Sequence, residues 1–216
     1  GCRRNTCTWR LAAGGSASHE PSYWEVNEQV AVRDSMNQDP DGICLDVFSY
    51  DRGGELRGPL DTEVSVLQTV ALATREVPRS AAFYRGLGFE VLFDRVLDFP
   101  GLQALLGADQ PVRIHNINLM KDGNIVPGRV EMFGYLDMEH LPDAPLRDQA
   151  VPPNLGILSA SLASSDLDAD CARLCELGAE PVARASVSLP GFGPCQVATL
   201  FGPDGELLEL FCRSGS

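Results

Sequence analysis

Residues 202–211 read GPDGELLELF, a tight turn followed by a short apolar run with one acid in its middle. Proline and glycine mark the turn, and the composition of the run predicts a β-strand. Side chains alternate between the two faces of a strand, so Glu209 and Phe211 share one face while Leu208 and Leu210 share the other. An acid on such a strand either faces water or points into a cavity.

The composition is that of a globular protein of one or two domains. The chain has 216 residues, of which 44% are hydrophobic and 22% charged. Asp and Glu total 30 against 17 Lys and Arg, a net charge of -13. Nucleic acid and anionic membranes require basic surface, so neither is expected as a partner. The odd number of cysteines, seven, without a disulfide-dense pattern favours a reducing cytoplasm.

An internal repeat organises the second half of the chain. When the segment that begins near residue 64 is shifted by ninety positions, it overlays a later segment without a gap. The matched pairs include Leu72 with Leu162, Ala82 with Ala172, Gly88 with Gly178 and Glu90 with Glu180. Each copy is predicted to be a strand, a helix and three further strands. We therefore predict an α+β fold of paired βαβββ modules, residues 64–137 and 154–214, that form a curved mixed sheet around a cavity.

The N-terminal part predicts only a fraction of a further module. Residues 1–22 are rich in Gly, Ser, Ala and Arg without a clear period, and are expected to form a poorly ordered arm or a segment whose order depends on a neighbour. Strands are expected around residues 30–32 and 43–50. Residues 1–60 are thus interpreted as a partial module with its closing hairpin and a linker, and residues 61–216 as the main domain. Because a partial module leaves a sheet edge or face exposed, a homodimer is expected.

Several motifs of the modules are specific when taken together. They are VAL at residues 70–72, PRSAAFY at residues 78–84, LGF at residues 87–89 and PDG at residues 203–205, followed by Glu209. This pattern resembles the vicinal oxygen chelate superfamily, which includes glyoxalase I, bleomycin-resistance proteins and extradiol dioxygenases. The resemblance covers residues 64–214. It implies a cavity bordered by the modules and the binding of a small organic molecule there.

The resemblance also implies four positions for a metal site, on the first and last strand of each module. In this sequence they are Thr69, Glu131, Ser159 and Glu209. The two first-strand positions are usually histidine in the family, and hydroxyl groups are poor ligands for Fe, Zn, Ni or Mn. We therefore expect no cofactor. The alternative is a divalent metal ion with ligands outside the family positions.

The acids Glu131 and Glu209 are the first catalytic candidates. As a pair they could serve as general base and general acid. The alternative is that both are remnants of a metal site, hydrogen-bonded to Thr69 and Ser159 across the sheet. Phe133 and Phe211 share the faces of these acids and are expected to line the cavity, where aromatic rings contact an apolar ligand.

The strand expected at residues 112–120 carries polar side chains on both faces. One interpretation directs His115 and Arg113 into the cavity, with His115 as a catalytic residue. The other directs Asn116 and Asn118 there, to orient a polar group of the ligand. A structural role for His115 is the alternative to catalysis.

Two function classes follow from these residues. The first is a metal-independent protein that binds a small, largely apolar organic molecule, with acid/base chemistry by Glu131 or Glu209. The second is a metal-dependent lyase, isomerase or ring-cleaving dioxygenase. The replacement of the expected histidines favours the first class.

Overall fold

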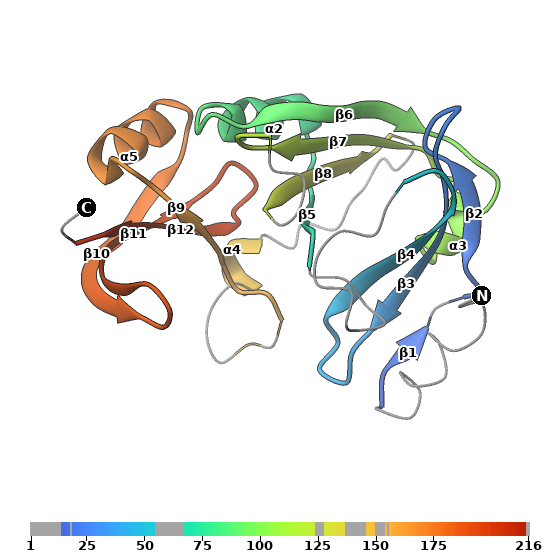
Figure 1. The fold of residues 1–216 in the computed structure, drawn as a ribbon, viewed down its shortest axis with the longest axis horizontal. Helices are drawn as coiled ribbons and strands as arrows, with labels where there is room; N and C mark the ends of the chain where they lie inside the picture. Colours follow the sequence, from blue (N-terminus) through green and yellow to red (C-terminus); the bar gives the residue numbers. More distant parts are fainter. Residues whose placement is uncertain are drawn as a thin grey trace. The chain divides into compact units, whose positions relative to one another are not determined.

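The computed structural model describes residues 14–17, 19–54, 67–123, 128–136, 146–149, 154 and 156–214 (Figure 1). They form an α+β fold with three four-stranded sheets. The described residues divide into two compact units. The described residues of unit 1 lie within Gly1–Leu67, Val96–His115 and Tyr135–Glu139. Those of unit 2 lie within Gln68–Arg95, Asn116–Gly134 and His140–Ser216.

Unit 1 contains an antiparallel sheet in which β3 pairs with every other strand. Its strands are β1 (Ser16–Ala17), β2 (Ser22–Glu25), β3 (Ala31–Gln38) and β4 (Cys44–Arg52). The hairpin expected from the N-terminal sequence is therefore present as β3 and β4. Its turn is stabilised by Asp39, whose Oδ1 accepts hydrogen bonds from the backbone N–H groups of Asp41 and Ile43.

Part of the N-terminal arm is ordered by a neighbouring strand. Ser16 and Ala17 form β1 and pair with β3, opposite Gln38 and Asn37. For these two residues the expected dependence on a neighbour is confirmed, because an available strand edge gives their backbone groups partners that composition does not reveal. Residues 1–13 lie outside the described residues, as do residues 55–66.

A short insertion from the first module covers one face of this N-terminal sheet. It contains α3 (Leu102–Leu105), which packs on β2 and β3. Leu102 and Leu105 are buried, and the Phe99 ring stacks on Trp24 with 5.2 Å between ring centroids. This segment supplies the apolar cover that the partial module would otherwise lack.

Unit 2 holds most of two βαβββ modules with the same topology. The first consists of β5 (Thr69–Ala73), α2 (Val77–Arg85), β6 (Glu90–Leu97), β7 (Ile114–Met120) and β8 (Arg129–Tyr135). The second consists of β9 (Ala160–Ala163), α5 (Leu167–Glu176), β10 (Glu180–Leu189), β11 (Gly193–Phe201) and β12 (Leu207–Arg213). In each sheet the first strand of the module pairs in parallel with the last, β5 with β8 and β9 with β12. The predicted pair of modules is confirmed, and each module keeps its own sheet.

The two module helices begin and end where the repeat predicts. Pro78 stands in the first turn of α2, and Asp166 caps α5 by accepting a hydrogen bond from the N–H of Ala169 at 3.0 Å. Gly88 and Gly178 follow the helices with φ angles of 86° and 99°, a backbone conformation that favours glycine.

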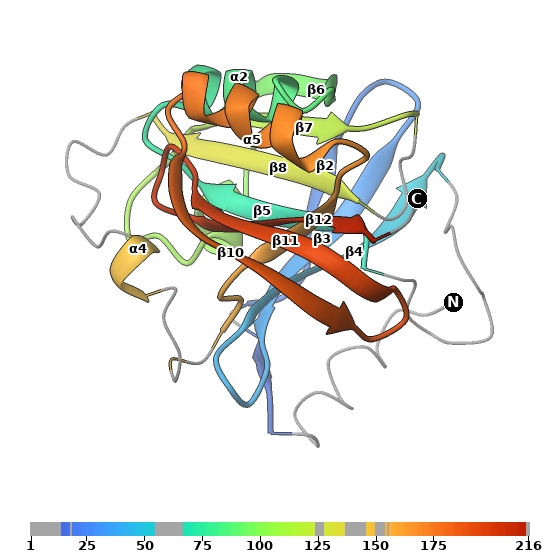
Figure 2. The same ribbon diagram turned by 90° about the vertical axis from the view of Figure 1, so that its left-hand side faces the viewer.

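The helices α2 and α5 lie side by side over the sheets (Figure 2) and share one hydrophobic core. Phe83 and Leu87, four residues apart in the chain, are buried there, together with Tyr84 and Leu174. The guanidinium of Arg173 donates a hydrogen bond to the Gly86 carbonyl at 3.0 Å, which also joins α5 to the end of α2. Within the described residues, no helix has the length and apolar character needed to cross a membrane.

The turn that precedes β12 is fixed to α2 by a buried polar network. Tyr84 donates its phenol hydrogen to Glu206 Oε1 at 3.0 Å, and the Asp204 backbone N–H donates to Glu206 Oε2 at 2.9 Å. Ser80 Oγ donates to Asp204 Oδ2 at 2.5 Å. Glu206 is only 5% exposed. These contacts hold the start of β12 and thereby position Glu209, three residues further along the chain.

The short helix α4 (Leu146–Gln149) lies in the connector between the modules. Arg147 places its guanidinium 4.3 Å from the centroid of the Phe201 ring and donates to Glu180 Oε2 at 2.6 Å. One turn of the connector is therefore attached to the strands of the second module.

Candidate functional site

Strand β12 separates an apolar core face from an open face, as the alternation predicts. Leu208 and Leu210 are each 1% exposed and pack in the core beneath α5. Glu209 and Phe211 lie on the other face, directed away from the helix. The acid at the centre of the strand thus points into a cavity.

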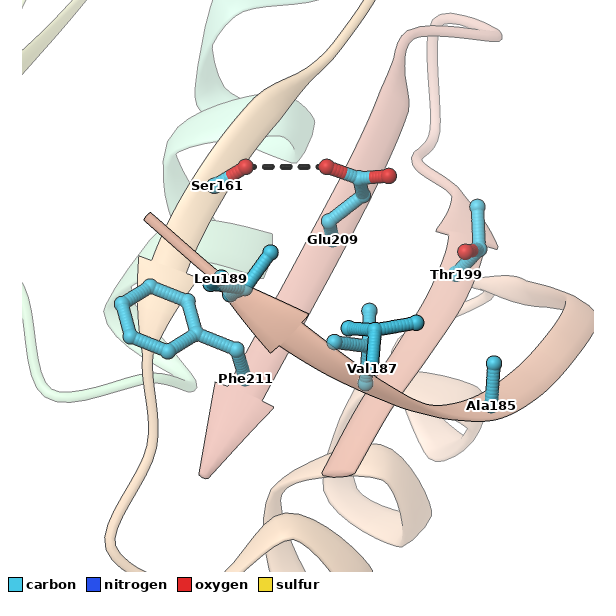
Figure 3. Close-up of a pocket in the computed structure, with 8 residues that line it drawn as sticks. Ser161, Ala185, Val187, Leu189, Thr199, Glu209 and Phe211 are labelled. Carbon is cyan, nitrogen blue, oxygen red and sulfur yellow. Dashed lines mark hydrogen bonds between the residues drawn. The ribbon is translucent and has the colours of Figure 1, made fainter. Parts of the chain in front are cut away.

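This cavity has a volume of about 250 Å³, and all of the described residues that line it belong to the second module (Figure 3). Strands β9, β10, β11 and β12 all contribute to it. The lining residues are Ser161, Ala185, Val187, Leu189, Val197, Thr199, Glu209 and Phe211. The walls are mainly apolar, with a polar end at Glu209.

Two serine hydroxyls hold one oxygen of the Glu209 carboxylate. Ser161 Oγ donates to Oε2 at 2.9 Å (Figure 3), and Ser159 Oγ donates to the same oxygen at 3.4 Å. Glu209 Oε1 makes no hydrogen bond within the described part of the chain. The carboxylate therefore has one oxygen fixed by the protein and one available to a bound molecule.

Ser161 was missed by sequence reasoning, which selected Ser159. The parallel pairing of β9 with β12 sets Ser161 directly opposite Glu209 and displaces Ser159 by two residues. A contact of Ser159 with the acid was expected and is present, but it is the longer of the two. The signal that could have found Ser161 is its alternation with Ser159 on the same face of one strand.

Aromatic side chains flank the other end of the cavity. Phe211 makes an edge contact with Phe192, with 4.8 Å between ring centroids. The guanidinium of Arg213 lies 5.5 Å from the centroid of the Phe192 ring. Phe211 thus lines the cavity, as expected, and is held in place by a second ring.

Glu131, the equivalent acid of the first module, has a different partner. The Asn116 amide Nδ2 donates to Glu131 Oε1 at 2.6 Å, and Asn116 is 4% exposed. In the pairing of β5 with β8, Ala71 stands opposite Glu131 and Thr69 stands opposite Arg129. Phe133 is half-buried and shares the Glu131 face of β8.

The structure decides which face of β7 accompanies Glu131. Ile117 and Leu119 are buried in the core under the helices, so Asn116 and Asn118 lie on the opposite face, toward Glu131. Asn118 Oδ1 is buried and makes no hydrogen bond within the described part of the chain. His115 has the phase of Ile117, and Arg113 precedes the strand, so the interpretation that joins this pair to the acids is corrected. We assign no catalytic role to His115.

The two acids belong to different sheets. Glu131 is on the β8 strand of the first sheet and Glu209 on the β12 strand of the second. Among the residues that the structure describes, none from the first module lines the cavity beside Glu209. The alternation of side chains along each strand correctly predicted that each acid lies on the face directed away from the core. It could not show that these two faces belong to separate sheets.

The residues around the acids do not fit the divalent metal centre that the fold family implies. Glu131 accepts a hydrogen bond from an amide N–H group, and Glu209 accepts hydrogen bonds from two hydroxyl groups. Iron and zinc favour imidazole and thiolate ligands together with carboxylate. Among the described residues, no group of three or more His, Cys, Asp or Glu side chains is arranged to hold one ion.

The sequence matches no protein-family model and no curated protein. Solved structures are nevertheless similar to it. A glyoxalase family protein from Bacillus cereus superimposes with a TM-score of 0.60 at 16% identity, over 73% of this chain and 100% of that chain. Glyoxalase I from Zea mays superimposes with a TM-score of 0.57 at 19% identity, over 94% of this chain and 60% of the maize chain. This chain thus spans 60% of the length of the maize protein, and it shares its fold with these glyoxalase structures.

Proposed function

We propose that this protein binds a small, largely apolar organic molecule in the cavity of the second module. The observation that carries the proposal is the composition of the lining. Five of its eight residues are apolar, namely Ala185, Val187, Leu189, Val197 and Phe211, and a carboxylate stands at one end. Apolar walls with a few convergent polar groups are characteristic of small-molecule sites.

The size and shape of the cavity favour a compact ligand. Its volume of about 250 Å³ is near the lower end for small-molecule sites. Phe211 offers an aromatic surface, and its contact with Phe192 restricts its motion. A ring or a short branched chain would bury most of its surface against these walls.

Glu209 is the residue placed to act chemically on such a molecule. Its Oε2 is held by Ser161 and Ser159, so that the remaining lone pairs of Oε1 face the cavity. A carboxylate oriented in this way accepts a hydrogen bond from the ligand or removes a proton from it. This chemistry requires no metal ion, in keeping with the hydroxyl and amide partners of the two acids.

Ligand binding is expected to produce localised changes in an NMR spectrum. Addition of 2-phenylethanol to ¹⁵N-labelled protein should shift the backbone amide signals of the strands β10, β11 and β12 around Val197 and Phe211. The Ala185→Trp variant fills the cavity from the edge strand and should weaken binding by roughly tenfold or more, since the apolar contact surface is lost. EDTA should leave the shifts unchanged.

The matched control is Ser188→Trp, which places the same side chain on the opposite face of β10. It should retain binding of 2-phenylethanol. Shifts scattered over the whole protein, or equal losses in both tryptophan variants, would contradict the proposed site. A requirement for a divalent ion would support the metal-dependent alternative.

We also propose that the chain forms a homodimer. Strand β10 is at the edge of its sheet, and every one of its ten residues is exposed or only half-buried. Val182 and Phe192 are exposed apolar residues on or beside this strand, 51% and 47% exposed. A long edge strand with apolar side chains favours pairing with another chain. Size-exclusion chromatography with light scattering should give twice the chain mass of 23.3 kDa, and a monomer at all concentrations would exclude the dimer.

A further inference from the structure

We infer that the molecule bound in the second-module cavity carries a protonated amine, which pairs with Glu209. This inference rests on the proposed function and specifies the chemical class of the ligand. It follows from the distribution of charge around the cavity, from the hydrogen bonds of Glu209 and from the charge of the whole chain.

Glu209 is the only ionisable residue among the eight that line the cavity. The cation nearest along the same face of β12 is Arg213, four residues away, and its guanidinium lies against the Phe192 ring outside the lining. Arg184 is on the opposite face of β10, where it donates to Asp168. A ligand in the cavity therefore meets a negative charge without a compensating cation from the lining.

The hydrogen bonds of Glu209 indicate which kind of group a ligand should supply. The serine hydroxyls already donate to Oε2, whereas Oε1 has no donor within the described part of the chain. An ammonium group supplies donors and a positive charge together, and such charge-assisted hydrogen bonds are about twice as strong as neutral ones. A ligand hydroxyl would donate without the charge, and a carboxylate would be repelled.

Two further properties of the site favour a cation with an apolar body. Phe211 lies two residues from Glu209 on the same face, a separation of about 7 Å along the strand. An aromatic ring at this distance contacts the alkyl arm of an amine and attracts its charge. The chain also carries a net charge of -13 and therefore has a negative electrostatic potential. A cavity with apolar walls strengthens this potential locally, which raises the concentration of cations there.

The test compares three probes that share a phenylalkyl body: 2-phenylethylamine, 2-phenylethanol and 3-phenylpropionate. NMR titrations of the ¹⁵N-labelled full chain should give an affinity for the amine roughly tenfold above that for the alcohol, with the anion weakest. The preference for the amine should decrease as salt is raised, because salt screens the interaction of charges. In Glu209→Gln the amine should bind no more tightly than the alcohol.

Glu176→Gln is the matched control. It removes the same charge from an exposed position on α5, which covers the opposite side of the sheet, and it should keep the preference for the amine. If the alcohol binds in the cavity but the amine binds no more tightly, or if the preference survives in Glu209→Gln, the inference is overturned and the proposed function stands. If none of the three probes shifts the signals of the lining, both are overturned.

Discussion

Replacing Gly202 by alanine is expected to lower the free energy of unfolding by about 3 kcal/mol. The methyl group would overlap the carboxyl group of Glu206, which is buried and fixed by Tyr84 and the Asp204 backbone. Relief of the overlap requires the carboxylate to move, and both of its hydrogen bonds are then lost. The φ angle of Gly202 lies outside the left-handed region, so alanine introduces no backbone strain there. Urea denaturation monitored by circular dichroism measures the effect.

Gly86→Ala is the matched control for this substitution. A methyl group at Gly86 would overlap the end of the Leu177 side chain, which is 39% exposed and free to move toward solvent. Gly86 has α-helical backbone angles, and alanine there should change stability by less than about 1 kcal/mol. The loss of unfolding free energy caused by Gly202→Ala should also be much smaller in a Glu206→Ala background, because the carboxyl group that the new methyl group overlaps is absent. An unchanged cost in that background would show that the carboxylate is not the obstacle.

The architecture of the modules was accessible from the sequence because its determinants are local. A turn residue, a cap and the alternation of apolar residues recur in both copies, and a repeat doubles the weight of each signal. Gly88 and Gly178, which align in the repeat, thus each follow a module helix. The core positions Phe83 and Leu87 followed from their spacing on one helix face.

The contacts of the candidate site were not accessible, because they depend on pairing between distant segments. The register of β9 against β12 brings Ser161 rather than Ser159 opposite Glu209, and no local pattern sets that register. Asn116 bonds to Glu131 only because β7 presents its even-numbered residues to that face. Polar residues on both faces of the strand left the phase open. The sequence equally left open whether the two acids shared one sheet, since alternation defines faces and not neighbours.

The buried position of Glu206 makes the stability of this fold depend on pH. Burial is the main cause that raises the pKa of this carboxyl above its ordinary value of 4.5, and the neighbouring charge of Asp204 adds to the rise. Backbone N–H groups and the hydroxyl of Tyr84 oppose it. The folded state therefore keeps the proton to a higher pH than the unfolded state. The stability that this group contributes is present in full below about pH 4.5 and is lost as the pH rises through the raised value.

Glu206→Gln should consequently be more stable than the wild type at neutral pH, although it alters a buried hydrogen-bonded residue. Glutamine mimics the neutral acid, since its amide oxygen accepts from the Asp204 N–H while its amide nitrogen donates to Tyr84 Oη. The difference in unfolding free energy between wild type and variant should be small at pH 4 and should grow as the pH rises, by about 1.4 kcal/mol for each unit of the pKa rise. Denaturation curves measured at several pH values give this difference, in which the other titrating groups cancel.

Tyr84→Phe tests the same carboxyl from the other side. It removes a hydrogen bond that favours the ionised form, so it should cost about 2 kcal/mol above the raised pKa of Glu206, where this carboxyl is charged, and less at pH 4. Its pH dependence should therefore be steeper than that of the wild type, while the double variant Tyr84→Phe with Glu206→Gln should lack the Glu206 titration altogether. If Tyr84→Phe lowers the free energy of unfolding by the same amount at both pH values, the titration of Glu206 is not the source of the pH dependence.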